Sequence, residues 1–257
     1  MALYLGSKKV SPTKTITKEV SSMKPFFDAG GKCAYSIATS FDGAIQYNDT
    51  SNVTDMSNMF GSCSKLTTIP QLDTSNVTDM NRMFYVCSKL TTIPQLDTSK
   101  VTNMKDMFYY CSKLTTIPQL DTSKVTNMDS MFSSCSSLTS VPQLDTRNVT
   151  SMNRMFNYCS SLTSVPQLDT SKVIEFSFIF NNCISLETIH MFNMKVNFDI
   201  SSSTKFTREA LVEIINNCYD VTTLNKTAKL TMGSTNLAKL TDEDKLIATN
   251  KGWTLAW

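Results

Sequence analysis

The sequence is poor in residues on which many enzymes depend. Its 257 residues include one histidine, His190, two tryptophans and seven glycines. A catalytic dyad or triad with an imidazole base would have to form around His190, and no plausible partner lies nearby in the sequence. Glycine-rich phosphate loops, CxxC pairs and HExxH motifs are absent as well. We therefore expect a protein that is not an enzyme and that needs no cofactor or metal.

Charge balance and the lack of long apolar runs exclude further classes. The 24 Lys and Arg residues nearly match the 22 Asp and Glu residues, so no excess of positive charge would attract nucleic acid. No window holds 18 consecutive apolar residues, and residues 1–10 have neither the apolar run nor the cleavage site of a signal peptide. We expect a chain that neither crosses a membrane nor carries an export signal.

The most informative feature of the sequence is a repeat of 24 residues. A cysteine recurs at this interval at Cys63, Cys87, Cys111, Cys135, Cys159 and Cys183. The surrounding frame recurs with it, without insertion or deletion, in six coils at residues 49–72, 73–96, 97–120, 121–144, 145–168 and 169–192. Such regularity is typical of proteins built from stacked repeats, in which each unit contacts its neighbours along one axis.

Each coil has two apolar segments of different spacing. The first predicts the inward face of a short helix or helical turn, which in one coil consists of Val77, Met80, Met83, Phe84 and Cys87. The second, residues 90–96, predicts a short strand that ends at Pro94, because proline cannot donate to a ladder. Parallel strands lie about 4.8 Å apart, so six coils predict a rod of roughly 30 Å.

The two ends of the chain are not in register with the repeat. We expect an N-terminal attachment or capping segment at residues 1–43, the repeats at 44–192 and a C-terminal α/β cap at 193–257. Thr204 or Thr207 can open one helix of this cap, and Thr241 can open another. The elements expected at the ends are strands at 3–5, 34–37 and 253–257 and helices at 206–217 and 241–250.

The repeat frame resembles a known family. The stretch MFGSCSKLTTIPQLDTSNVTDM, residues 59–80, closely resembles the BspA-like branch of leucine-rich repeats, including its mycoplasma-lipoprotein type, and the resemblance covers residues 49 to about 192. The stretches 230–242 and 248–253 resemble the tail of such repeats in gut Bacteroidales and their phages, and residues 2–10 resemble the start of phage fibre proteins. The resemblance implies a right-handed leucine-rich-repeat solenoid of the α/β class, with a short parallel β-sheet on one face, short helices on the other and caps at both ends.

The resemblance also implies a function. Members of this repeat family act as surface adhesins and virion components rather than enzymes. Because residues 1–10 show no signal peptide or lipobox, we expect first a virion protein of a phage tail fibre, head fibre or receptor-binding appendage, made in the host cytoplasm. A bacterial cell-surface adhesin is the alternative, and a cytoplasmic scaffold is the third hypothesis. The expected partners are other virion proteins, reached through residues 1–43, a host surface protein or glycan, and further copies of the chain, three in a fibre.

The cysteine column suggests metal or redox chemistry until its geometry is considered. Cysteines of neighbouring coils would run parallel about 5 Å apart, whereas a disulfide needs Cβ atoms that converge to about 3.8 Å. A single file of thiols also cannot surround a zinc ion with four ligands. We expect the column to be a core ladder of buried free thiols, and Cys33 and Cys218 to be free as well.

Two other columns are polar. Aspartates recur at Asp49, Asp73, Asp97, Asp121, Asp145 and Asp169, where each can accept N–H bonds in a local Asx turn, the alternative being bound Ca²⁺. Threonines recur at Thr67, Thr91, Thr115, Thr139 and Thr163, a pattern that superficially resembles an ice-binding ladder. Threonine is simply a good exposed strand residue, and we read the column as such.

Tyrosines gather where the coils are free to differ. Tyr85, Tyr109, Tyr110 and Tyr158 follow the Met-Phe pair of their coils. Exposed tyrosines give a large contact area with a hydrogen-bonding tip, which suits a sugar or protein surface. The alternative is that these rings are partly tucked against the next coil. We take the four tyrosines as the candidate binding residues.

Overall fold

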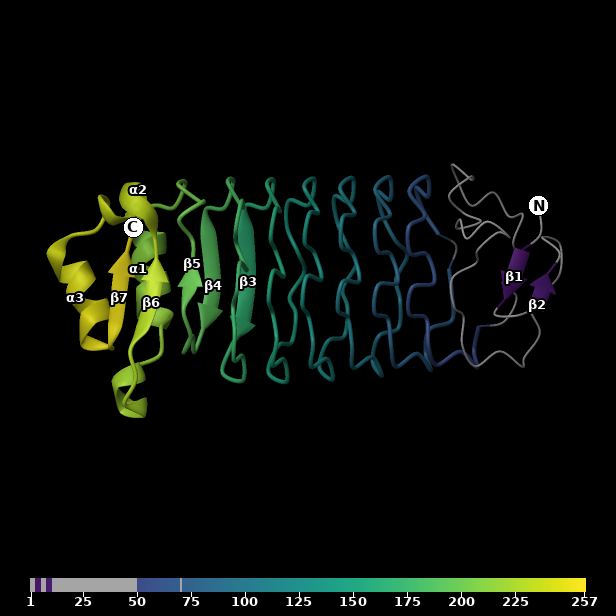
Figure 1. Ribbon diagram of the computed structural model, residues 1–257, viewed down its shortest axis with the longest axis horizontal. Helices are drawn as coiled ribbons and strands as arrows, with labels where there is room; N and C mark the ends of the chain where they lie inside the picture. The colour runs from purple at the N-terminus through teal and green to yellow at the C-terminus, as the bar shows by residue number, and fades with distance from the viewer. Residues whose placement is uncertain (1–2, 6–7, 11–49, 70) are drawn as a thin grey trace.

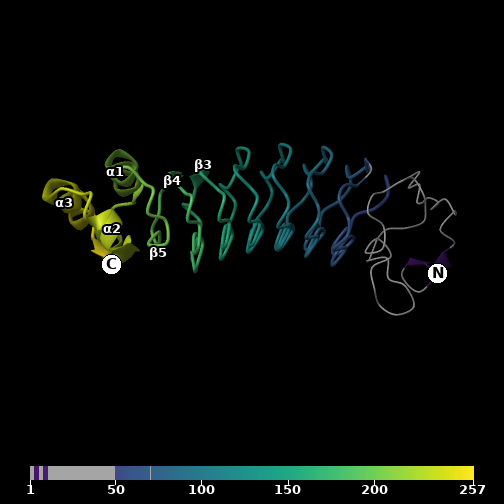
Figure 2. The same ribbon diagram turned by 90° about the horizontal axis from the view of Figure 1, so that it is seen from above.

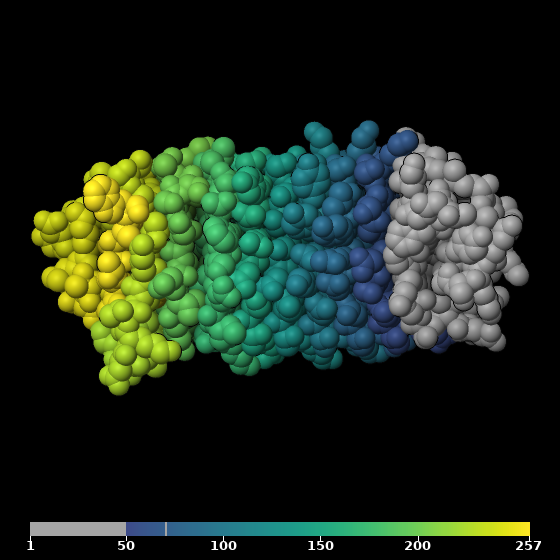
Figure 3. All heavy atoms as spheres, in the orientation of Figure 1, coloured from purple at the N-terminus to yellow at the C-terminus, as the bar shows by residue number. Residues whose placement is uncertain are grey.

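A computed structural model describes residues 3–5, 8–10, 50–69 and 71–257. From residue 50 the chain winds into a row of stacked coils, and helices appear at the C-terminal end of the row (Figure 1). Seen from above, the coils follow one another along a single axis (Figure 2). The described atoms fill an elongated body without a deep hole in the face shown (Figure 3). The predicted strand at residues 34–37 and most of the predicted attachment segment lie outside the described residues.

The strands are short, and all but one pair are parallel. β1 and β2 pair antiparallel, β3 pairs with β4, and β5, β6 and β7 form a sheet in this order. Their bounds are Leu3–Leu5, Lys8–Val10, Ser164–Asp169, Thr188–Phe192, Phe198–Asp199, Ala228–Thr231 and Trp253–Ala256. In Figure 1, β3 to β7 succeed one another along the axis of the stack. The predicted strands at residues 3–5 and 253–257 are confirmed.

The helices of the described residues all lie after the coils. Their bounds are α1 Arg208–Asn217, the 3-10 turn η2 Val221–Leu224, α2 Gly233–Leu237 and α3 Asp242–Asn250. The hydroxyl of Thr207 accepts from Ala210 N at the start of α1, and Thr241 forms a capping box with Asp244 at the start of α3. Both predicted helices are therefore confirmed, with threonine caps as expected.

The coils themselves are built from consecutive turns, and the predicted short helices within them are wrong. Alternate N–H groups close tight turns by donating three residues back, as Met83 does to the Met80 carbonyl at 3.1 Å. The N–H groups between them donate to the next coil, as Phe84 does to the Met107 carbonyl at 2.9 Å. An α-helix would need each N–H to bond four residues back. The neighbouring coil takes those donors instead, so the inward spacing is right but the helix is not.

Two residues in each coil adopt a left-handed backbone. The φ angle lies between 53° and 64° at Asn58, Arg82, Asp106, Ser130, Arg154 and Phe178, and at Ser62, Val86, Tyr110, Ser134, Tyr158 and Asn182. None of these residues is glycine, so each conformation costs roughly 1–2 kcal/mol. The stack compensates, because the left-handed residues donate to the next coil, as Arg82 does to Lys105 at 3.0 Å and Val86 to Tyr109 at 2.7 Å.

The core is a set of columns that run along the axis. Val77, Met80, Met83, Phe84 and Cys87 are fully buried, as are their equivalents in the next coils. Six phenylalanines from Phe60 to Phe180 stack with nearly parallel rings, and their centroids lie 5.4–5.9 Å apart. This step exceeds the expected 4.8 Å because stacked rings adopt centroid separations of about 4.5–7 Å. Each ring covers the ring of the previous coil.

The predicted strand at the second apolar segment forms a regular ladder in two coils. β3 does not end at its proline: it spans Pro166, and its pairing with β4 shifts register between Val165 and Leu168. The register shifts because Pro166 has no N–H to donate to the neighbouring strand. In earlier coils the glutamine after each proline substitutes for the lost bond, since Gln95 Nε2 donates to the Gln119 carbonyl of the next coil at 2.7 Å. A side-chain ladder thus bridges the gap that proline leaves.

Candidate functional site

Two outward columns run side by side after the buried phenylalanine of each coil. The first, called here the left-handed column, consists of Ser62, Val86, Tyr110, Ser134, Tyr158 and Asn182. The second lies two residues further and is called the serine column; it consists of Ser64, Ser88, Ser112, Ser136, Ser160 and Ile184. A buried cysteine separates the two columns in sequence. These outward positions vary in size while the cysteine between them does not.

Four coils of these columns enclose a shallow hollow of about 320 Å³. Its lining is Tyr110, Ser112, Ser134, Ser136, Tyr158, Ser160, Asn182 and Ile184. None of these lining residues is charged. Tyr110 is 48% exposed and Tyr158 is 54% exposed, so each residue leaves about half of its surface to solvent. The hollow therefore presents two aromatic rings and several small polar groups to an incoming ligand.

Three serines of the hollow already donate hydrogen bonds to the preceding coil. The hydroxyl of Ser112 donates to the Ser88 carbonyl at 3.2 Å, and that of Ser136 donates to the Ser112 carbonyl at 3.3 Å. Ser160 donates in the same way to Ser136 at 3.4 Å. A serine hydroxyl has one proton and two lone pairs. The lone pairs that remain make this wall an acceptor surface.

The structure separates the four candidate tyrosines into two pairs. Tyr110 and Tyr158 line the hollow, whereas Tyr85 and Tyr109 stack on each other with centroids 5.0 Å apart and are partly buried. Arg82 lies over the Tyr85 ring, 5.2 Å from its centroid. Tyr85 and Tyr109 are thus tucked against a neighbouring coil, which is the alternative that the sequence left open.

The repeat cysteines form a buried file of hydrogen-bond donors. Cys111 Sγ lies 3.1 Å from the Phe84 carbonyl, and Cys135 Sγ lies 3.1 Å from the Phe108 carbonyl. The thiols of Cys87, Cys111, Cys135, Cys159, Cys183 and Cys218 are free and buried. Burial raises the pKa of Cys135 to about 12, so the thiol stays protonated at neutral pH. Within the described residues this file is a packing element.

Cys63 departs from this file, because it is disulfide-bonded. The prediction that every cysteine is free is therefore wrong at Cys63. Parallel packing disfavours a disulfide only between repeat cysteines of neighbouring coils, so it does not require that Cys63 be a free thiol. The prediction for Cys33 lies outside the described residues.

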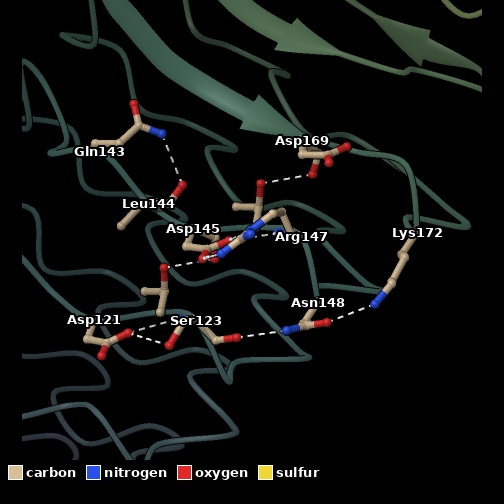
Figure 4. Close-up of polar contacts among 11 residues, drawn as sticks. Asp121, Ser123, Gln143, Leu144, Asp145, Arg147, Asn148, Asp169 and Lys172 are labelled. Atoms are coloured by element: carbon tan, nitrogen blue, oxygen red, sulfur yellow. Dashed lines mark hydrogen bonds and ion pairs between the residues drawn. The ribbon is translucent and has the colours of Figure 1, made fainter.

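The aspartate column forms Asx turns. Asp121 Oδ1 accepts from the Ser123 N–H at 3.0 Å and from its hydroxyl at 2.7 Å, and Asp145 accepts from Arg147 (Figure 4). These bonds lower the pKa of both carboxyl groups, through the Ser123 side chain at Asp121 and through the Arg147 side chain at Asp145. Figure 4 also shows Lys172 reaching Asn148 in the preceding coil, at 2.8 Å. The prediction for Asp49 lies outside the described residues.

The described part of the chain was searched for metal sites, acid–base pairs and membrane-spanning helices. No group of three or more His, Cys, Asp and Glu residues there could hold a metal ion. His190 Nδ1 lies 2.7 Å from Glu213 Oε1, and both side chains are more than 40% exposed. None of the described helices is long and apolar enough to cross a membrane.

Sequence reasoning missed the serine column and a second hollow. The second hollow, of about 410 Å³, lies between the last coil and the C-terminal segment and is lined by residues that include Ile174, Phe178 and Phe198. Its sequence signal is the loss of the repeat frame at residues 174–178. The serine column had a signal too, because serine recurs one residue after each of the first five repeat cysteines.

A comparison with protein families identifies the repeat. No curated protein matches the sequence. One family model matches in three overlapping stretches, residues 13–116, 87–189 and 113–217, which together span most of the chain. Overlapping matches are expected when one model fits successive sets of repeats. The chain belongs to the family described as Mycoplasma protein of unknown function, DUF285.

Proposed function

We propose that the chain is a non-enzymatic attachment protein, in which a solenoid of the leucine-rich-repeat class presents its outward columns to a partner. One observation carries the proposal. The inward positions are the same in the first five coils and are buried, whereas the left-handed column varies and places Tyr110 and Tyr158 half-exposed over a hollow. Packing explains constant inward residues, while a half-exposed aromatic pair is typical of recognition surfaces.

The absence of catalysis in this proposal rests on what the titratable groups do. The free thiols are buried and held protonated, and the aspartates accept turn bonds from their own coil. His190 and Glu213 form an open surface pair, whereas catalytic acids and bases gather in clefts. Each of these groups therefore has a structural explanation.

For the location we propose a virion appendage, such as a tail fibre, head fibre or receptor-binding protein, with residues 1–43 as the attachment segment. This choice follows the resemblance of residues 2–10 to phage fibre proteins. A cell-surface adhesin is the second candidate, and it is favoured by the family match, whose description names a cellular organism. The repeat scaffold serves both, since a rigid stack can carry a binding face away from its anchor.

Immunogold electron microscopy tests both locations at once. Antibodies raised against the full chain are applied to cells of the source culture and to any virus particles it releases. Label on tail or head appendages supports the virion placement, and label on intact cells supports the adhesin. Label confined to the cytoplasm of sectioned cells would contradict the attachment function and leave the scaffold reading.

A further inference from the structure

We propose that the hollow between Tyr110 and Tyr158 is a binding site for a neutral glycan chain, which lies along the stack with sugar rings on the two tyrosines. This inference rests on the proposed attachment function and adds the chemical class of the ligand. Four features of the hollow carry it: the spacing of the rings, their fixed backbone, the direction of the serine hydrogen bonds and the lack of charge.

The first feature is the spacing of the rings. Tyr110 and Tyr158 occupy the same position two coils apart, with Ser134 between them. Next to them, the centroids of the stacked phenylalanine rings of successive coils lie 5.7 and 5.8 Å apart. One hexose of an extended glycan is of similar length, so a chain that lies along the stack can place alternate sugars on the tyrosines and the sugar between them over Ser134. The apolar C–H face of a sugar packs on an aromatic ring, and the phenol oxygen remains free for a hydrogen bond.

The second feature is that both tyrosines are held by the backbone of the stack. Tyr110 has φ 58° and Tyr158 has φ 59°, a conformation that non-glycine residues seldom adopt. Each N–H bonds to the next coil, Tyr110 to the Ser133 carbonyl and Tyr158 to the Asn181 carbonyl, both at 2.8 Å. The rings are therefore attached to a rigid backbone, so less conformational entropy is lost when a ligand binds.

The third and fourth features concern polarity. Because Ser112, Ser136 and Ser160 donate to the preceding coils, their free lone pairs accept hydrogen bonds, which sugar hydroxyls can donate. Asn182 adds an amide that both donates and accepts. With no charged residue in its lining, the hollow gives no counter-charge to a sulfated glycan, a nucleic acid or an acidic peptide. A neutral chain rich in hydroxyls matches this wall.

The test is binding of the full chain to immobilised neutral polysaccharides, namely a β-1,4-glucan, a mannan and a galactan, with heparin as the charged comparison. We expect binding to at least one neutral polymer and much weaker binding to heparin. The double variant Tyr110→Ser/Tyr158→Ser should bind that polymer at least about tenfold more weakly, the loss typical of truncated hot spots. Tyr110→Phe/Tyr158→Phe should retain most of the binding, because the ring faces remain.

Two further variants separate recognition from folding. Tyr85→Ser/Tyr109→Ser removes the same number of tyrosines outside the hollow and should leave binding within about threefold of the wild type. Ser134→Glu places a carboxylate between the two rings without changing either and should weaken binding at least about tenfold. Ser134 already has a positive φ, and its side chain is partly exposed, so the variant is expected to fold.

Cell adhesion measured in parallel distinguishes the two proposals. If the wild type adheres to cells and the Tyr110→Ser/Tyr158→Ser variant adheres equally well, the glycan site is wrong and the attachment function stands. If adhesion depends on the tyrosines but no neutral polymer binds, the ligand is a protein and the glycan proposal is overturned. Adhesion by neither protein would overturn the attachment function itself.

Discussion

The coils of residues 50–192 and the segment of residues 193–257 satisfy their backbones in different ways. In the coils, N–H groups alternate between their own turn and the next coil, as Met83 and Phe84 do. After residue 193 the parallel strands continue as β5, β6 and β7, but helices replace the turns, and the Leu211 N–H donates to Thr207 four residues back. A coil of turns therefore needs a neighbour, whereas a helix does not. This difference explains how a repeat can end: the segment that follows must supply its own hydrogen bonds.

The largest expected effect comes from breaking the stacked rings. Phe132→Ala should lower the free energy of unfolding by about 3–5 kcal/mol, because it removes a fully buried ring from the middle of the column. Chemical denaturation followed by circular dichroism measures the change. Phe178→Ala is the matched control: this residue is 57% exposed and its ring centroid lies 5.5 Å from Arg154, so its removal should cost no more than about 1 kcal/mol. Equal losses at the two sites would contradict the column as the source of stability.

A smaller loss is expected from the thiol file. Cys135→Ala removes the donor that reaches the Phe108 carbonyl at 3.1 Å and should cost about 1–2 kcal/mol. Cys135→Ser keeps a donor at the same place and should recover part of that loss in the same denaturation experiment. If the serine variant is less stable than the alanine variant, the hydrogen bond is unimportant and the sulfur acts through its apolar volume alone.

One substitution should stabilise the coils. Val86 is β-branched and has φ 58°, whereas the equivalent position in the last coil is Asn182, a residue type that tolerates this backbone. Val86→Asn should raise the free energy of unfolding by about 0.5–1 kcal/mol, because it relieves the strain without removing a buried group. Lys89→Asn, at an exposed position of the same coil, is the control and should change stability little. A loss of stability in Val86→Asn would show that the packing of the valine side chain contributes more than its left-handed backbone costs.

The smallest effect is on pH dependence. The turn bonds lower the pKa of Asp97 and Asp121 below the unfolded value of about 3.9. The folded state then binds fewer protons than the unfolded state in this range, so the contribution is present above about pH 4 and is lost as the pH falls through the folded pKa. Denaturation midpoints between about pH 2 and pH 6 should decline on the acid side. Asp97→Asn/Asp121→Asn should flatten the decline, and an unchanged decline would place its origin elsewhere.

Much of this architecture follows from the sequence, for identifiable reasons. The interval of 24 residues fixes the coil, and the apolar spacing of residues 77–87 fixes which side chains are buried, because burial depends on pattern. The same spacing could not distinguish a helix from consecutive turns. That choice depends on whether the Phe84 N–H finds a carbonyl in its own coil or in the next one, and the partner is a property of the assembled stack. Long-range partners of this kind leave no local signal.

The candidate site was predictable to the same degree. The sequence placed four tyrosines on outward positions but could not tell that Tyr110 and Tyr158 share a hollow while Tyr85 and Tyr109 stack on each other. The two pairs differ because they occupy adjacent positions of the coil. Tyr110 and Tyr158 belong to the left-handed column, whereas Tyr85 and Tyr109 each come one residue before it. A left-handed φ at a non-glycine residue is not visible in the sequence. The direction of those side chains therefore had to come from the structure.

The central claim, that alternate N–H groups in the turns of each coil donate to the next coil, can be tested directly by scalar couplings across hydrogen bonds in NMR spectra. The measurement identifies which carbonyl accepts from a given N–H. The structure predicts a coupling from the Phe84 N–H to the Met107 carbonyl, 23 residues further along the chain, and the Leu211 N–H should couple to Thr207 as an internal reference for a helix. A coupling from Phe84 to Met80, four residues back, would contradict the account and restore a helix to the coil.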